Sequence, residues 1–217
     1  MTAVTDHPPA ASADRRRDRR RKAKAILAAG LVLGVGAAVT LAAWNDSEFA
    51  QSTFTAGTFD LEGAEGAGTA FTEHATSGAA AALEFTAPVD NLAPGDSVYA
   101  AFAVRLKADT TTDASVTFAG VTNTGTVTNL TYGVALVTAA GTANCTSTSF
   151  AGGTSVIADG TAITSVGTPT AFTLLKGSPV TTSGAAQYLC FKVSAGSGLD
   201  QGQTGSATWQ IQATSTT

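Results

Sequence analysis

The chain has 217 residues and a formal net charge of −4, but this charge averages two unlike parts. Residues 1–43 carry eight Lys/Arg against three Asp/Glu, whereas residues 44–217 carry four against thirteen. An acidic main part repels phosphate backbones, so the composition disfavours a nucleic-acid-binding protein. The main part is rich in Ala, Thr, Gly and Ser, which favours β-structure with Gly- and Asn-rich turns, and its length suits one domain.

Residues 1–43 are typical of a signal peptide. A basic segment, residues 1–24 with the run RRRDRRRK, precedes nineteen uncharged residues, 25–43. Positive charge stays on the cytoplasmic side of the membrane and orients the apolar stretch, so we predict a signal-peptide helix and Sec-type export. Small residues place the cleavage site at Ala42 or Ala43, directly before Trp44.

An uncleaved membrane anchor is the alternative for this segment. Nineteen apolar residues are just long enough to span about 30 Å of hydrocarbon. Gly30, Gly34 and Gly36, together with many alanines, make the segment weakly hydrophobic for a permanent span. Cleavage is therefore the favoured interpretation, with only transient contact between the protein and the membrane.

The first third of the main part gives few clear signals. Residues 52–61 are expected to be extended, with a break at Gly57, and residues 62–78 are expected to form a loop without periodicity. Residues 81–86 are a candidate for a short strand. Residues 91–96 predict a type II turn, because Pro94 presets φ and Gly95 permits a positive φ at the next position.

The rest of the main part alternates apolar and polar residues with a period of two, as half-buried strands do. The residue pattern of 186–193 is apolar on both faces, which predicts a central strand. Many short strands separated by turns predict an all-β fold, a single antiparallel β-sandwich over residues 59–217. The remaining expected strands are 98–107, 114–121, 130–138, 155–163, 171–175 and 206–213.

Two motifs carry a family resemblance. Trp44-Asn45-Asp46 follows the apolar segment, and residues 54–61 read FTAGTFDL. This arrangement resembles the SipW-dependent signal peptide and mature start of the TasA/camelysin family. Residues 91–96, NLAPGD, resemble a second turn motif of that family, and the resembling segments cover about a quarter of the chain. The resemblance implies a jelly-roll-like sandwich, a SipW-type signal peptidase as partner and a bacterial source.

Residues 44–58 have two interpretations. In the family resembled, such segments are donated as a strand to the next subunit, with cleavage as the switch that frees them. Trp44, Phe49, Phe54 and Phe59 would then be the assembly residues, since β-augmentation places side chains in pockets of the partner. The alternative is that Phe54 and Phe59 pack into the sandwich of their own domain as its first strand.

Cys145 and Cys190 are the two cysteines of the chain. In an exported protein, two cysteines at this separation are expected to form one disulfide. The alternative is two separate thiols, with Cys190 simply buried in its strand.

No residue pattern predicts catalysis or a resident cofactor. Apart from His7 in the leader, His74 is the one histidine, and a zinc site needs three or four ligands. Neither an H-E-x-x-H motif nor a G-x-S-x-G elbow occurs, so we expect no enzymatic activity. Asp60, Glu62 and Glu65 offer oxygen ligands for weak calcium binding, but a solvated acidic edge is the favoured interpretation.

The expectation is therefore a secreted or surface-associated structural protein. It would assemble into a homopolymer, as a fibre subunit of an extracellular biofilm matrix, through its N-terminal strand after signal cleavage. The alternative is a monomeric β-sandwich that binds a partner through its loops.

Overall fold

The structure is a computed structural model, and it describes residues 12–39, 48–53, 55–66, 70–86, 89–138 and 144–216. The chain divides into two compact units, Met1–Phe54 and Thr55–Thr217.

The first unit contains one helix, α1, Ser12–Val39. It combines the basic run and most of the apolar segment of the leader, as the sequence predicts for a signal-peptide helix. Among the residues that the structure describes, no helix is both long enough and apolar enough to cross a membrane. The residues around the expected cleavage site, Ala42, Ala43 and Trp44, lie outside the described residues.

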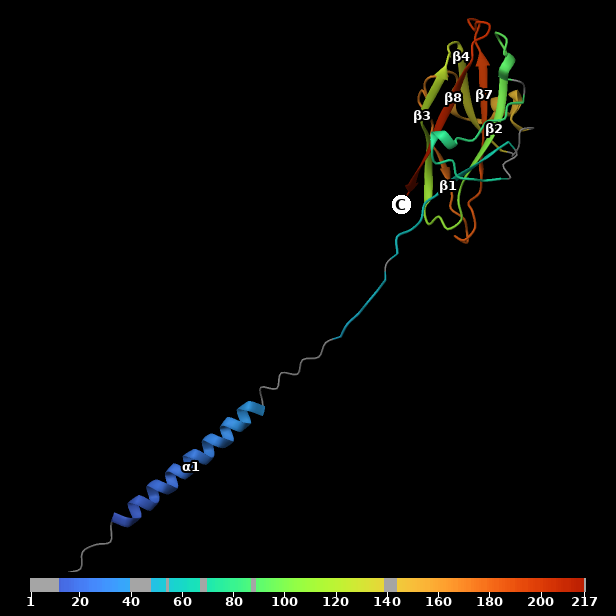
Figure 1. Cartoon of the computed structure of the whole chain (residues 1–217). Helices are drawn as coiled ribbons and strands as arrows, with labels where there is room; N and C mark the ends of the chain where they lie inside the picture. The colour runs from blue at the N-terminus through green and yellow to red at the C-terminus, as the bar shows by residue number, and fades with distance from the viewer. Residues whose placement is uncertain are drawn as a thin grey trace, which may run out of the picture. The chain divides into compact units, whose positions relative to one another are not determined.

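The second unit consists of two antiparallel sheets packed face to face, which confirms the predicted all-β sandwich (Figure 1). Within the described residues, the larger sheet has five strands in the order β1-β2-β7-β4-β5, and the smaller has three in the order β6-β3-β8. The strands are β1 Leu61–Glu65, β2 Ser97–Leu106, β3 Asp113–Gly125, β4 Leu130–Val137, β5 Thr154–Ala162, β6 Phe172–Leu174, β7 Gln187–Ala195 and β8 Gly205–Thr216.

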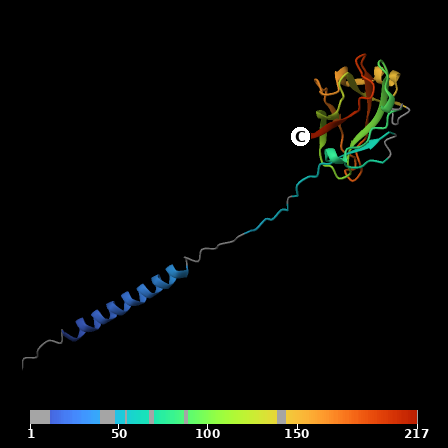
Figure 2. The same cartoon turned by 45° about the horizontal axis from the view of Figure 1, so that its top comes forward.

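The core lies between the two sheets, which face each other in both views (Figure 2). Phe118 of β3 packs edge-on against Phe191 of β7, with ring centroids 5.9 Å apart. Alternate side chains of β3, namely Ala114, Val116 and Phe118, are buried as their spacing predicts.

The prediction of a central strand is confirmed for β7, which lies between β2 and β4. Leu189 and Phe191 are buried on one face and Cys190 on the other. The neighbouring strand β2 is also buried on both sides, because Ala101 and Ala103 are covered although their face was expected to be the polar one. Small side chains on that face allow other elements to lie close to it.

The first strand is where the sequence prediction is wrong. Strand β1 begins at Leu61 and runs through residues that were expected to form a loop, pairing with β2. In the described part of residues 52–60, the only ladder contact is one parallel bridge between Thr58 and Thr110. The pattern LEGAE does not alternate, so it gives no local signal for a strand. Leu61–Glu65 form a strand because they pair with the edge of β2, where Glu62 also forms an ion pair with Arg105.

Residues 81–86 also differ from the prediction of a strand. Ladder pairing there is a single bridge between Phe85 and Ala100, yet Ala81, Leu83 and Phe85 alternate with exposed neighbours. The turn before β2 is confirmed: Asp96 N donates to Ala93 O at 3.0 Å and Gly95 has φ of +97°.

A short helix, α2 Ser147–Gly152, was not predicted because STSFAG has poor helix propensity. Thr146 caps it, accepting from Ser149 N while Ser149 Oγ accepts from Thr146 N. The Cys145–Cys190 disulfide, predicted from the sequence, joins this region to β7. Together with Tyr99, Val137 and Phe150, the disulfide and Ala101 form a small apolar cluster apart from the main core.

Candidate functional site

The candidate site is a groove along the free edge of β8. Strand β8 pairs with β3 on one side and has no partner strand on the other among the described residues. Beside this edge lies a cavity of about 940 Å³, at the upper end of the size range of ligand pockets. We call this cavity the β8 groove. Its apolar lining includes Val98 and Val104 of β2, Phe191 and Val193 of β7, and Trp209 and Ile211 of β8.

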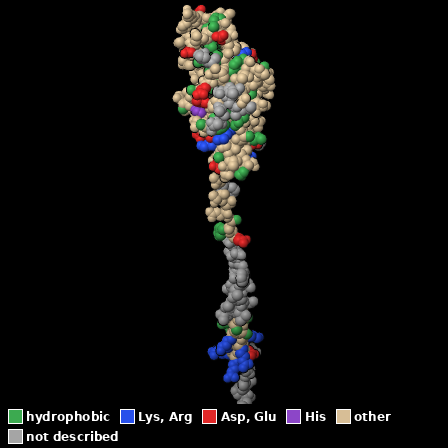
Figure 3. Space-filling view, turned by 90° about the vertical axis from the view of Figure 1, so that its right-hand side faces the viewer, with side chains coloured by type: hydrophobic (Ala, Val, Ile, Leu, Met, Phe, Trp, Pro, Cys, Tyr) green, Lys and Arg blue, Asp and Glu red, His purple; other side chains and the backbone are tan. Residues whose placement is uncertain are grey.

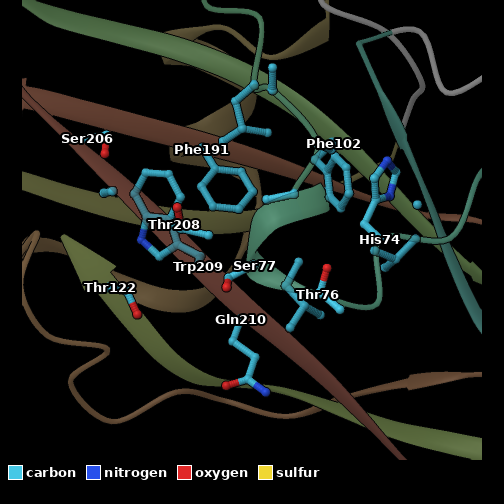
Figure 4. A pocket seen from close by; sticks show the side chains of 18 of the residues that line it. His74, Thr76, Ser77, Phe102, Thr122, Phe191, Ser206, Thr208, Trp209 and Gln210 are labelled. Atoms are coloured by element: carbon cyan, nitrogen blue, oxygen red, sulfur yellow. The ribbon is translucent and has the colours of Figure 1, made fainter. Parts of the chain in front are cut away.

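The groove exists because the smaller sheet is narrower than the larger one. Gly63 of β1 and the half-buried Phe102 of β2 line it, so the groove lies over part of the inner face of these two strands. Figure 4 shows the rings of Phe191 and Trp209 next to each other, with Phe102 and His74 facing them. The Phe191 and Trp209 centroids are 5.3 Å apart, and His74 lies 6.4 Å from Phe102.

The opposite wall is an irregular segment, residues 70–86 and 89–92, which we call the strap. Leu83, Phe85 and Leu92 of the strap pack against the main core. Its backbone is attached to the larger sheet at a few places. Thr72 and Gly63 exchange two backbone hydrogen bonds of 2.9 Å, Ala82 N donates to Glu65 Oε1 at 2.8 Å, and Thr86 N donates to Tyr99 O at 2.8 Å. The strap therefore borders the groove without completing the smaller sheet.

Polar side chains line the rim of the groove on both walls. Thr122, Thr208 and Gln210 lie on the side of the smaller sheet, and Thr76 and Ser77 belong to the strap (Figure 4). Asp60, Glu62 and Glu73 also line the cavity, so the site combines an apolar lining with uncharged and acidic polar groups. It suits a mainly apolar occupant that also has main-chain hydrogen-bonding groups.

Every Lys and Arg of the second unit has an acidic partner. The four pairs are Arg105–Glu62 at 2.5 Å, Lys107–Glu73, Lys192–Asp159 at 2.7 Å and Lys176–Asp113 at 3.8 Å. Charged side chains are sparse on the face of this unit in Figure 3. Paired cations and a net negative charge disfavour contact with a phosphate backbone.

Tyr132 lies below the groove and is fully buried. Its hydroxyl donates to Ser165 O at 2.9 Å, and its ring lies 5.4 Å from that of Trp209. Burial raises the pKa of the Tyr132 phenol, and the neighbouring Trp209 indole acts against this shift. Trp209, which lines the groove, thus packs against Tyr132 of the core.

The predicted assembly residues differ in where they lie. Phe49 is 95% exposed, whereas Phe59 packs against the core of its own domain and lines the groove. Trp44 and Phe54 lie outside the described residues. For Phe59, the structure therefore shows the packing that the alternative interpretation expected.

The candidate metal ligands do not come together. In the part of the chain that the structure describes, no three His, Cys, Asp or Glu side chains are grouped to hold a metal. Glu62 is engaged by Arg105 and Glu65 by the strap backbone. His74 is half-buried, and its Nε2 lies 3.2 Å from Thr72 Oγ1.

Sequence reasoning missed the groove itself. The alternation of Ala207, Trp209, Ile211 and Ala213 correctly predicts that they face inward, and all four are half-buried. Whether the adjacent edge is paired depends on strand order, for which the sequence has no local signal. The half-buried state of Trp209, a large apolar side chain, shows that the inner face of β8 is incompletely covered.

Comparison with known protein families gives no match, and comparison with characterised proteins gives none either. The functional conclusions therefore depend on the sequence and the geometry of the molecule.

Proposed function

We propose that this protein is an exported structural subunit that assembles into a homopolymeric fibre of an extracellular matrix. In this proposal, a signal peptidase of the SipW type removes residues 1–43 and frees residues 44–57, the arm. The arm of one subunit then occupies the β8 groove of another. The role is structural rather than enzymatic.

The observation that carries the proposal is the apolar groove along the free edge of β8. A free edge presents unpaired main-chain N–H and C=O groups, and such edges pair readily with another chain. Here the edge adjoins a cavity lined by Trp209, Ile211 and Phe191, which offers pockets for the side chains of an added strand.

The arm supplies a matching occupant. Phe49, in the first unit, is 95% exposed and would supply an apolar side chain to the groove. Residues 44–57 would extend over about 46 Å, whereas residues 206–213 of β8 extend over about 23 Å. The arm is therefore long enough to fill the groove of a neighbour and still connect two domains.

Two further features support export. The cysteines form a disulfide, and disulfides persist in oxidising compartments. The basic and apolar leader forms the helix expected of a signal peptide.

The test compares purified protein starting at Trp44 with protein starting at Thr55 by electron microscopy. Residues 55–217 form a compact unit with its own core, so both forms should fold. We expect filaments from the first and monodisperse particles from the second. Monodisperse particles from both would refute the proposal and favour a monomeric binding module that uses the same groove.

A further inference from the structure

The strand directions in the sandwich determine how an arm can pair with β8. We call the end of the sandwich where β8 ends at Thr216 the near end, and the end where β8 begins at Gly205 the far end. The near end also contains the turn between β2 and β3, because Asp113 pairs with Thr216. The far end contains the turn after β3, because Gly125 pairs with Gly205.

The arm joins its own domain at the near end. Thr58 bridges Thr110, which lies in the turn between β2 and β3. Thr111 N donates to Thr58 O at 3.0 Å, and the Thr58 hydroxyl donates to Asp109 O. A Cβ at Gly57 would overlap Thr111 Oγ1, so glycine permits this close approach.

These contacts form a junction that fixes where the arm begins. Asp60 N donates to the hydroxyl of Thr110, which is 1% exposed, and Lys107 N donates to Asp60 O at 3.0 Å. Residues 57–60 of the FTAGTFDL motif thus anchor the arm to its own domain. The part left for donation precedes Gly57.

From this placement we infer that the arm adds to β8 of a second copy as an antiparallel strand, in an open polar fibre. The inference rests on the proposed function. In a head-to-tail fibre, the near end of one subunit faces the far end of the next. The arm then enters the neighbour's groove at the far end. Its C-terminal residues lie nearest the far end, and its N-terminal residues reach toward the near end.

The direction of the chain follows. Inside the neighbour, the arm runs from the near end toward the far end, while β8 runs from the far end toward the near end. The two strands are therefore antiparallel. An arm folded back into its own groove would run parallel to β8, and so would arms exchanged in a two-fold dimer whose near ends meet.

The existing sheets favour the antiparallel arrangement. Every ladder between the described strands is antiparallel, including that between β3 and β8. An antiparallel arm would extend the smaller sheet in the same pattern, and antiparallel pairing is slightly more stable per residue than parallel pairing.

Pairs of introduced cysteines in the mature protein starting at Trp44 can determine whether the arm runs parallel or antiparallel to β8. The pairing register of the two strands need not be known. Glu48→Cys and Ser52→Cys are each combined with one cysteine at alternate β8 positions, 206, 208, 210, 212 or 214. Cys145 and Cys190 are joined to each other and do not interfere. A short thiol cross-linker joins residues on adjacent strands, but not residues separated by six positions, about 20 Å along a strand.

Wild-type protein is first examined for filaments by electron microscopy, and each variant is then cross-linked and analysed by denaturing electrophoresis. We expect covalent ladders. The best β8 partner of position 52 should lie about four residues before that of position 48, as one-to-one antiparallel pairing requires. Variants with a β8 cysteine alone serve as controls and should give no ladder.

Three results would overturn the inference while leaving strand donation intact or modified. A partner that shifts toward the C-terminus of β8 would show parallel pairing. A covalent band that stops at the dimer would show a closed exchange, and an intramolecular product alone would show folding back. Absence of filaments from the wild type would instead refute the proposed function, and the inference with it.

Discussion

The two faces of the larger sheet both carry apolar surface, but the molecule covers them differently. On the outer face, the Cys145–Cys190 disulfide fixes the segment containing α2 over Ala101 and Tyr99. On the inner face, β8 covers β7, yet the neighbouring β2 and β1 border the open groove. One apolar surface is closed covalently within the chain, and the other is left open beside an unpaired strand edge.

The difference teaches where this chain has room for a partner. A closed outer face keeps β2 and β7 from exposing apolar surface on the side where α2 packs. On the inner face the strap supplies part of the cover, through Leu83, Phe85 and Leu92. The edge of β8 beside it has no partner strand among the described residues, although natural sandwiches commonly protect their edges. Four predictions test this contrast, from the largest expected effect on stability to the smallest.

Removing the disulfide should have the largest effect. The variant Cys145→Ala/Cys190→Ala should lower the free energy of unfolding by about 4 kcal/mol, because the bond closes a loop with a sequence separation of 45. Denaturant titration of the second unit measures this. Filament formation should persist below the unfolding transition, because the groove lies on the other face. An unchanged midpoint would show that the cover is held by packing alone.

Tyr132→Phe should cost about 1 kcal/mol, since it removes the hydrogen bond to Ser165 O. Burial raises the pKa of Tyr132 above its ordinary value of about 10. Below that value both states are protonated. Above it the unfolded state ionises first, so the free energy of unfolding of the wild type falls as pH rises.

The phenylalanine variant lacks this contribution to the pH dependence. The stability difference between wild type and variant should therefore shrink as the pH rises above about 10. Urea titrations at several pH values measure it. If the free energy of unfolding depended on pH in the same way in both proteins, the raised pKa of Tyr132 would be contradicted.

Ala213→Glu tests the open face. Ala213 is half-buried and lines the groove, so a carboxylate there would conflict with an apolar occupant while still reaching water through the opening. We expect a stability change within about 1 kcal/mol and loss of filaments. Ala119→Glu makes the same substitution at an exposed position of β3 that does not line the groove, and it is the matched control. Equal filament yields from both variants would argue against the groove as the assembly site.

Glu73→Gln should have the smallest effect. Glu73 pairs with Lys107, and both side chains are nearly half exposed, at 48% and 46%. The hydrogen bond and the charge of Glu73 raise the pKa of Lys107, so the substitution should lower that pKa, as NMR titration can show. Stability should change little, because an ion pair between solvent-exposed side chains contributes little. A much larger loss would identify this pair as the main attachment of the strap.

The sequence predicted those features that depend on local pattern. Period-two alternation identified β2, β3, β4 and β8 and the inward positions of β3 and β8, because a strand with one buried face must alternate. The apolar character of both faces of residues 186–193 identified β7 as a central strand. It failed at β1, whose five residues do not alternate and become a strand only by pairing with β2. The same limitation applies to residues 81–86, which alternate but form one bridge.

For the site, the sequence by itself determined the basic and apolar leader, the central strand, the cysteine pair and an inward-facing Trp209. Only the tertiary structure decided that β8 lies at a free edge, that a groove opens beside it and that Phe59 packs into its own domain. The physical reason is that alternation records which face of a strand is buried. Edge pairing and sheet width depend instead on strand order, which arises from contacts between residues far apart in the chain.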